Sequence, residues 1–154
     1  EPVEFVGHSQ GGIIAAQLAA DPQVRSHYRV ASVLTAGSPV AGFHPDSSVP
    51  MLNMENTRDI VPALDGGANA NRGHALTLHF DSEHLERKQG QDNPIAAHDI
   101  ATYTEAIREC ESADAGRYRN IEGVHRWEEE RRTRLGITEA TRTRSYIFDT
   151  RRVS

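Results

Sequence analysis

Short apolar runs alternate with helical patterns along the first two thirds of the chain. Strand-like runs cover residues 3–6, 30–35, 49–54 and 75–80. Continuous apolar character with β-branched residues, as in Val30–Thr35, is typical of a parallel sheet that is buried on both faces. Helical spacing covers Ile13–Ala20, which Asp21-Pro22 closes, and it returns from Ile100 to Cys110. This order predicts the α/β class, with a mostly parallel sheet flanked by helices.

The last third of the chain has a different pattern. Residues 111–119 have the composition of a linker, and Asn120–Leu135 is a helical segment whose charge run is typical of a solvated helix face. Thr141–Val153 alternates between apolar and polar residues and predicts a terminal strand. We therefore expect residues 1–110 to form one unit and residues 111–154 to form a tail with a charged helix and a strand.

Composition narrows the class of partner. The 154 residues carry a formal net charge of −5, and the basic residues are spread out until the tail, which argues against binding to nucleic acid. Cys110 is the only cysteine, so an internal disulfide framework is excluded. No apolar run has the length of a transmembrane segment, and no signal segment opens the chain. The localisation therefore stays open between the cytoplasm and secretion.

One strand-to-helix connection carries a chemical signature. The run Gly7-His8-Ser9-Gln10-Gly11 has the pattern G-x-S-x-G between a strand and a helix, which predicts Ser9 as an exposed nucleophile. In so tight a turn side chains at the flanking positions would collide, so we expect both Gly7 and Gly11 to be required. The N–H of Gln10, at the start of the helix, would stabilise negative charge on a reacting carbonyl oxygen. The alternative is a glycine-rich turn with an incidental serine.

A serine hydroxyl needs a base to take its proton and a third group to orient that base. After this kind of elbow the acid and then the histidine follow, each on a loop after a later strand. Asp59 fits the acid position, because it follows the strand at residues 49–54 and precedes the anchoring run Ile60-Val61-Pro62. The competing carboxylates are Asp46, Asp65 and Asp81.

Eight histidines compete for the role of the base. His98 follows the strand at residues 75–80 and stands at the head of the amphipathic helix, which is the expected position. His74 is the main alternative because it lies near Asp59 in sequence, but it precedes a strand. His8 lies inside the elbow, and we expect its side chain to point away from the serine. The remaining histidines have weaker contexts and are His27, His44, His79, His84 and His125.

With these residues in place, the chain resembles the class 3 lipase-like branch of the α/β-hydrolase superfamily. The segments that carry this resemblance are Val6–Gly12, Leu34–Pro39 and Asn56–Pro62. An Asp followed by Ile-Val-Pro looks like the acid loop of that branch, and the elbow is also similar to that of bacterial triacylglycerol lipases. The resemblance implies a serine esterase or lipase with Ser9 as nucleophile, Asp59 as acid and His98 as base.

Such an enzyme needs no metal or organic cofactor, and its substrate would be a small-molecule or lipid ester. Acyl transfer to an acceptor other than water, thioester hydrolysis and a catalytically silent interaction module stay as alternatives. The resemblance covers Pro2–Cys110 and lacks the earlier strands of the family. We therefore expect residues 1–110 to be the C-terminal half of an α/β-hydrolase domain, whose upstream half would supply the second oxyanion donor and any lid.

Overall fold

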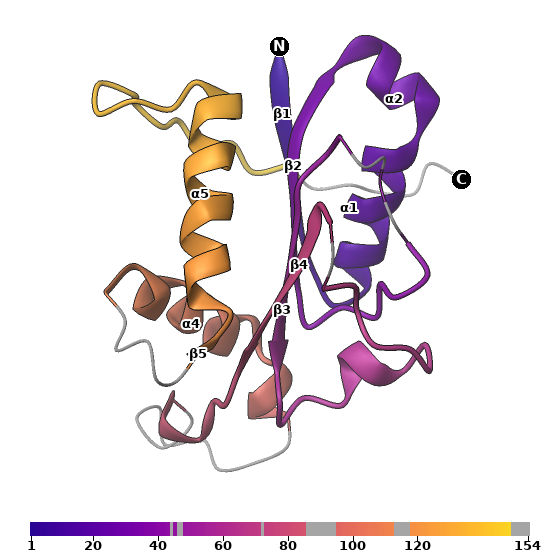
Figure 1. The fold of residues 1–154 in the computed structure, drawn as a ribbon, viewed down its shortest axis with the longest axis vertical. Helices are drawn as coiled ribbons and strands as arrows, with labels where there is room; N and C mark the ends of the chain where they lie inside the picture. Colours follow the sequence, from indigo (N-terminus) through magenta and orange to yellow (C-terminus); the bar gives the residue numbers. More distant parts are fainter. Residues whose placement is uncertain (44, 46–47, 72, 86–94, 113–117, 149–154) are drawn as a thin grey trace.

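A five-stranded sheet organises the described part of the chain (Figure 1). The computed structural model describes residues 1–43, 45, 48–71, 73–85, 95–112 and 118–148. The strands are β1 (Pro2–His8), β2 (Arg29–Ala36), β3 (Met51–Asn56), β4 (Ala75–Phe80) and β5 (Tyr118–Arg119). They lie side by side in sequence order, and every pair is parallel except the last, in which β5 runs antiparallel to β4. The predicted α/β class and the mostly parallel sheet are confirmed.

Helices cover both faces of this sheet. The α-helices are α1 (Gln10–Ala20), α2 (Pro22–His27), α4 (Ile100–Ser112) and α5 (Ile121–Leu135), and the 3₁₀ turns are η1 (Val61–Ala63) and η2 (Ala96–His98). Figure 1 shows α1 and α2 on one side of the sheet and α4 and α5 on the other. Within the described ranges, no helix is long and apolar enough to cross a bilayer.

The first four strands follow the predicted runs with small shifts. The run predicted over residues 49–54 forms a strand that starts at Met51 and ends at Asn56. Pro50 explains this start, because it has no N–H to donate to a sheet ladder and contributes only its carbonyl, to the N–H of Val33. Helix α2 was not among the elements predicted from the sequence. Asp21-Pro22 closes α1 and also starts α2, because the Asp21 carboxylate accepts the N–H of Gln23.

The segment predicted as a linker contributes to the sheet. Helix α4 extends to Ser112, and β5 pairs with the end of β4 through Tyr118 and Arg119, while residues 113–117 lie outside the described part. A two-residue strand is too short to give a periodic signal in the sequence. The predicted terminal strand is wrong for residues 141–148, which form no strand, and its remainder lies outside the described residues.

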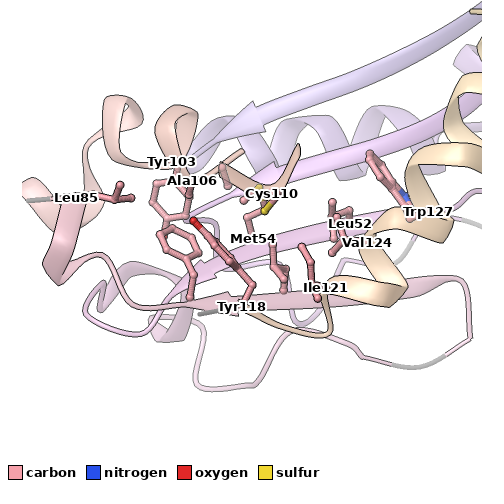
Figure 2. Close-up of a cluster of buried hydrophobic side chains, with 13 residues drawn as sticks. Leu52, Met54, Leu85, Tyr103, Ala106, Cys110, Tyr118, Ile121, Val124 and Trp127 are labelled. Atoms are coloured by element: carbon pink, nitrogen blue, oxygen red, sulfur yellow. The ribbon is translucent and has the colours of Figure 1, made fainter. Parts of the chain in front are cut away.

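Helix α5 packs one face on the sheet and leaves most of its charged residues on the other. Its buried side chains are Ile121, Val124 and Trp127, which join the cluster of Figure 2. Arg131 on the same helix forms a two-point ion pair with Glu4 of β1, in which Nη2 and Oε1 are 2.8 Å apart. The burial of Trp127 in this cluster, together with the ion pair of Arg131, docks the helix to the sheet.

The hydrophobic core consists of two clusters, one on each face of the sheet. The cluster under α4 and α5 contains the large aromatic side chains Phe80, Tyr103, Tyr118 and Trp127 (Figure 2). The cluster under α1 contains small alanine side chains of that helix against valines of β2, including Val30 and Val33. Small residues let α1 lie close to the strands, and this close approach fixes the start of α1 beside the end of β1.

Strand β1 is the edge of the sheet, and its second side pairs with no strand of the described residues. Its Val6 side chain is 61% exposed. Unpaired backbone groups beside an exposed apolar side chain favour association with another chain. We expect the 154-residue chain to self-associate as its concentration rises, which light scattering would detect, and we expect Val6→Lys to reduce this association.

Leu64→Lys is the matched control for this test, because Leu64 is 66% exposed and lies outside β1. The added charge is the same, so only the position relative to the edge strand differs. Equal loss of association in both variants would mean that net charge governs it. A wild-type chain that stays monomeric at every concentration would contradict the prediction.

Candidate active site

The turn between β1 and α1 holds Ser9 in an unusual backbone conformation. Ser9 has φ 57° and ψ −130°, and its N–H donates to the carbonyl of Ala36 over 2.9 Å. A positive φ is rare for a residue with a side chain and is typical of constrained positions at functional sites. The strand and the helix force this conformation, because the chain reverses within one residue.

The glycines of this turn differ in what they contribute. A Cβ on Gly7 would lie 2.1 Å from the carbonyl oxygen of Gly11, so Gly7 is required, as predicted. A Cβ on Gly11 would meet nothing within 4 Å, so the predicted steric need for Gly11 is wrong. The backbone of Gly11, and not its Cα substituent position, faces Gly7. Gly12 is the second glycine with a steric role in this turn, because a Cβ on Gly12 would lie 2.1 Å from the Ser38 Oγ.

We expect Gly7→Ala to lower the free energy of unfolding by about 3 kcal/mol, the upper end for overpacking, because the backbone that it meets cannot rotate away. Gly11→Ala is the matched control, and it should be neutral or stabilising by up to about 1 kcal/mol, since Gly11 lies inside α1. Urea unfolding of both variants measures the difference. Equal losses in the two variants would contradict this account of the turn.

The three predicted catalytic side chains lie together at the C-terminal ends of the parallel strands. Ser9 follows β1, Asp59 follows β3, and His98 ends η2, which comes after β4 along the chain. The Ser9 Oγ is 2.8 Å from the His98 Nε2, and the His98 Nδ1 is 2.7 Å from the Asp59 Oδ2. The side chain of Asp59 is 1% exposed and that of His98 is 26% exposed. The carboxylate is therefore buried behind an imidazole that remains accessible.

The competing carboxylates have other partners. The side chain of Asp65 accepts the N–H groups of Ala41 and Gly67, and that of Asp81 accepts the N–H of Glu83. Both are turn-stabilising uses of aspartate. Asp46 and His44 lie outside the described residues.

Five of the competing histidines have a position or a partner that differs from that of His98. His74 precedes β4 and therefore lies at the opposite end of the sheet from the ends of β1 and β3. The other four are held by neighbours, in the pairs His27 with Ser26, His79 with Glu55, His84 with Glu109, and His125 with the carbonyl of Cys110.

His8 does not point away from the site, contrary to the sequence-based expectation. Its Nε2 lies 2.8 Å from the backbone oxygen of His98, and the two imidazole rings are 4.8 Å apart between centroids. Alternation along β1 explains this position. Gly7 faces α1, so His8 faces the opposite side of the sheet, where His98 and Tyr103 lie.

Tyr103 is a second neighbour that the sequence analysis did not assign to the site. Its hydroxyl donates to the Asp59 Oδ2 over 2.7 Å and accepts the N–H of Asn56 over 3.2 Å. Burial and the hydrogen bond to Asp59 raise the pKa of Tyr103, so its hydroxyl keeps its proton. Its helical spacing indicated only a core position. A usable signal existed, because a buried tyrosine needs a hydrogen-bond partner and Tyr103 lies close to His98 in sequence.

Gln10 is the first residue of α1, directly after Ser9. The first N–H groups of a helix have no acceptor within the helix, so the N–H of Gln10 is available to a ligand beside Ser9. This position agrees with the expected oxyanion donor.

Comparisons of the chain with protein-family models, with curated proteins and with solved structures found no match. Among the described residues, no group of three or more His, Cys, Asp or Glu side chains is placed to hold a metal ion. The chemical capacity of the site therefore has to be derived from its geometry. A hydroxyl, an imidazole and a buried carboxylate in hydrogen-bonded sequence can transfer the hydroxyl proton to the imidazole and stabilise the resulting cation.

Proposed function

We propose that the protein is a serine hydrolase of the α/β-hydrolase type that cleaves carboxylic esters through an acyl-enzyme. The observation that carries the proposal is the continuous chain from the Ser9 Oγ through His98 to the Asp59 Oδ2, with contacts of 2.8 Å and 2.7 Å. Its position at an elbow with a positive φ supports the same assignment. The strand order β1-β2-β3-β4, with all of its pairs parallel, supports an α/β-hydrolase sheet from the nucleophile strand onward.

The proposed reaction has two acyl-transfer steps. His98 takes the proton of Ser9 as the Ser9 Oγ attacks the ester carbonyl, and the N–H of Gln10 donates to the oxygen that becomes negative. The proton on the His98 Nε2 then passes to the leaving alcohol, and the acyl group stays on Ser9. A water molecule, deprotonated by His98, then attacks the acyl-enzyme; the bond from the acyl carbon to the Ser9 Oγ breaks, His98 returns the proton to Ser9, and the acid is released. Asp59 keeps the Nδ1 of His98 protonated, so that Nε2 is free to act as the base.

Reaction with a fluorophosphonate probe tests the proposal directly, because such probes label a serine only where a base activates it. We expect stoichiometric labelling of Ser9 and turnover of a short p-nitrophenyl ester, with neither in Ser9→Ala or in heat-unfolded protein. Absence of labelling in folded wild-type protein would favour a silent interaction module. Ester products formed with an added alcohol would instead indicate transfer to an acceptor other than water.

A further inference from the structure

The Tyr103 hydroxyl has two hydrogen-bond partners among the described residues, and only one of them, the Asp59 carboxylate, can accept its proton. The Asn56 N–H can only donate, so the Tyr103 oxygen is its acceptor, at 3.2 Å. The single hydroxyl proton is therefore directed at the Asp59 Oδ2, at 2.7 Å. Since Tyr103 is 1% exposed, no bulk water competes for either contact.

Among the described residues, each hydrogen-bond partner of the Asp59 carboxylate is a donor or can act as one. The Oδ1 accepts the N–H of Val61 over 2.9 Å, and the Oδ2 accepts both from Tyr103 and from the His98 Nδ1. Three donors fix the rotation of the carboxylate. Because Tyr103 and His98 donate to the same oxygen, the negative charge on the Asp59 Oδ2 is shared between two hydrogen bonds.

The surroundings hold Tyr103 in this position. Its ring stands edge-on to Phe80, with centroids 5.4 Å apart and planes at 88°. Gly37, with φ 59°, leaves the space that the pair occupies, since a Cβ there would lie 2.9 Å from both the Asp59 Oδ2 and the Tyr103 Cε2. The backbone of the loop after β2 is thus shaped around the contact between the tyrosine and the carboxylate.

We propose that Tyr103 is a positioning residue, which acts on His98 through Asp59 by fixing the carboxylate and by limiting the charge on its Oδ2. The inference rests on the proposed function, because the positioned group is the base of that reaction. The Tyr103 hydroxyl bonds to Asn56 and Asp59 and not to Ser9, so its effect on His98 passes through one shared oxygen. A tyrosine with a purely structural role would affect stability but not the bond between His98 and Asp59.

Tyr103→Phe tests the inference, and Tyr118→Phe is its matched control. Both tyrosines are buried and pack on Phe80, and the Tyr118 hydroxyl also donates to a carboxylate over 2.7 Å, that of Glu109. Of these two tyrosines, only Tyr103 forms a hydrogen bond with Asp59. We expect Tyr103→Phe to lower kcat on a p-nitrophenyl ester about tenfold per labelled active site with KM unchanged, as for loss of a hydrogen bond to a charged group.

Proton NMR of the His98 Nδ1–H gives a readout that does not require turnover, with the resonance assigned by its loss in His98→Ala. Without the Tyr103 hydroxyl as a second donor, the Asp59 Oδ2 carries more negative charge, and we expect the hydrogen bond from the His98 Nδ1 to this oxygen to shorten. We therefore expect the resonance to move further downfield in Tyr103→Phe and to stay in place in Tyr118→Phe. An unmoved resonance in Tyr103→Phe, or an equal shift in both variants, would overturn the inference. Failure of the wild-type protein to react with a fluorophosphonate would instead count against the esterase proposal, and the NMR comparison would still decide the contact.

Discussion

Ser9→Ala and His98→Ala are each expected to lower ester turnover by roughly four to six orders of magnitude, because the members of a triad act as a unit. Alanine at position 9 leaves no atom to carry the acyl group. Alanine at position 98 leaves the Ser9 hydroxyl without the base that now lies 2.8 Å from it. Initial rates on a p-nitrophenyl ester, with protein concentrations corrected for folded fraction, measure both effects.

His74→Ala is the control for the assignment of the base. His74 precedes β4, at the end of the sheet that is remote from Ser9, so its removal should leave kcat/KM within a few-fold of the wild-type value. A severe loss in His74→Ala, together with a near-normal His98→Ala, would mean that a different histidine activates the serine. Circular dichroism of each variant separates such an effect from unfolding.

The sequence alone was sufficient to predict the three side chains that lie together. Each follows the end of a strand-like run, and in a parallel sheet those ends share one edge, so the order along the chain determines which side chains can meet. Asp59 and His98 are separated by 39 positions yet lie 2.7 Å apart, because β3 and β4 are neighbours. Only the existence of the strands matters for this proximity, so the shift of β3 from residues 49–54 to Met51–Asn56 does not change it.

Contacts that depend on the register of packing could not be predicted in this way. The face of the sheet on which His8 lies depends on which residue of β1 faces α1, and this contact with α1 has no signal in the local sequence. The steric need for glycine lies at position 12 and not at position 11 because of how α1 approaches Ser38, a residue of another loop. Similarly, β5 is a two-residue strand that is defined by its pairing with β4, so the propensity of its own residues is too weak a signal to predict it.

Asp59→Asn is expected to lower kcat by about 10⁴, as the tautomer argument for triads predicts. The environment of Asp59 makes this change unusually unfavourable, because its hydrogen-bond partners are donors or can act as donors, namely Val61 N–H, Tyr103 O–H and His98 Nδ1. An amide has only one oxygen, so its NH₂ must face at least one of these groups.

If the amide NH₂ of the Asp59→Asn variant takes the position of Oδ2, it faces both His98 and Tyr103. The His98 Nδ1 then becomes an acceptor and the proton moves to Nε2, which can no longer accept the proton of Ser9, while the buried Tyr103 hydroxyl loses its acceptor and the free energy of unfolding falls by about 1–3 kcal/mol. If the NH₂ takes the position of Oδ1, it faces only the part-buried N–H of Val61, and the loss of stability is smaller. Turnover and urea unfolding of the variant together distinguish these two orientations. Asp65→Asn is the matched control, since that carboxylate only accepts backbone N–H groups in a turn, and it should keep wild-type turnover. Wild-type turnover in Asp59→Asn itself would assign the orienting acid to another residue.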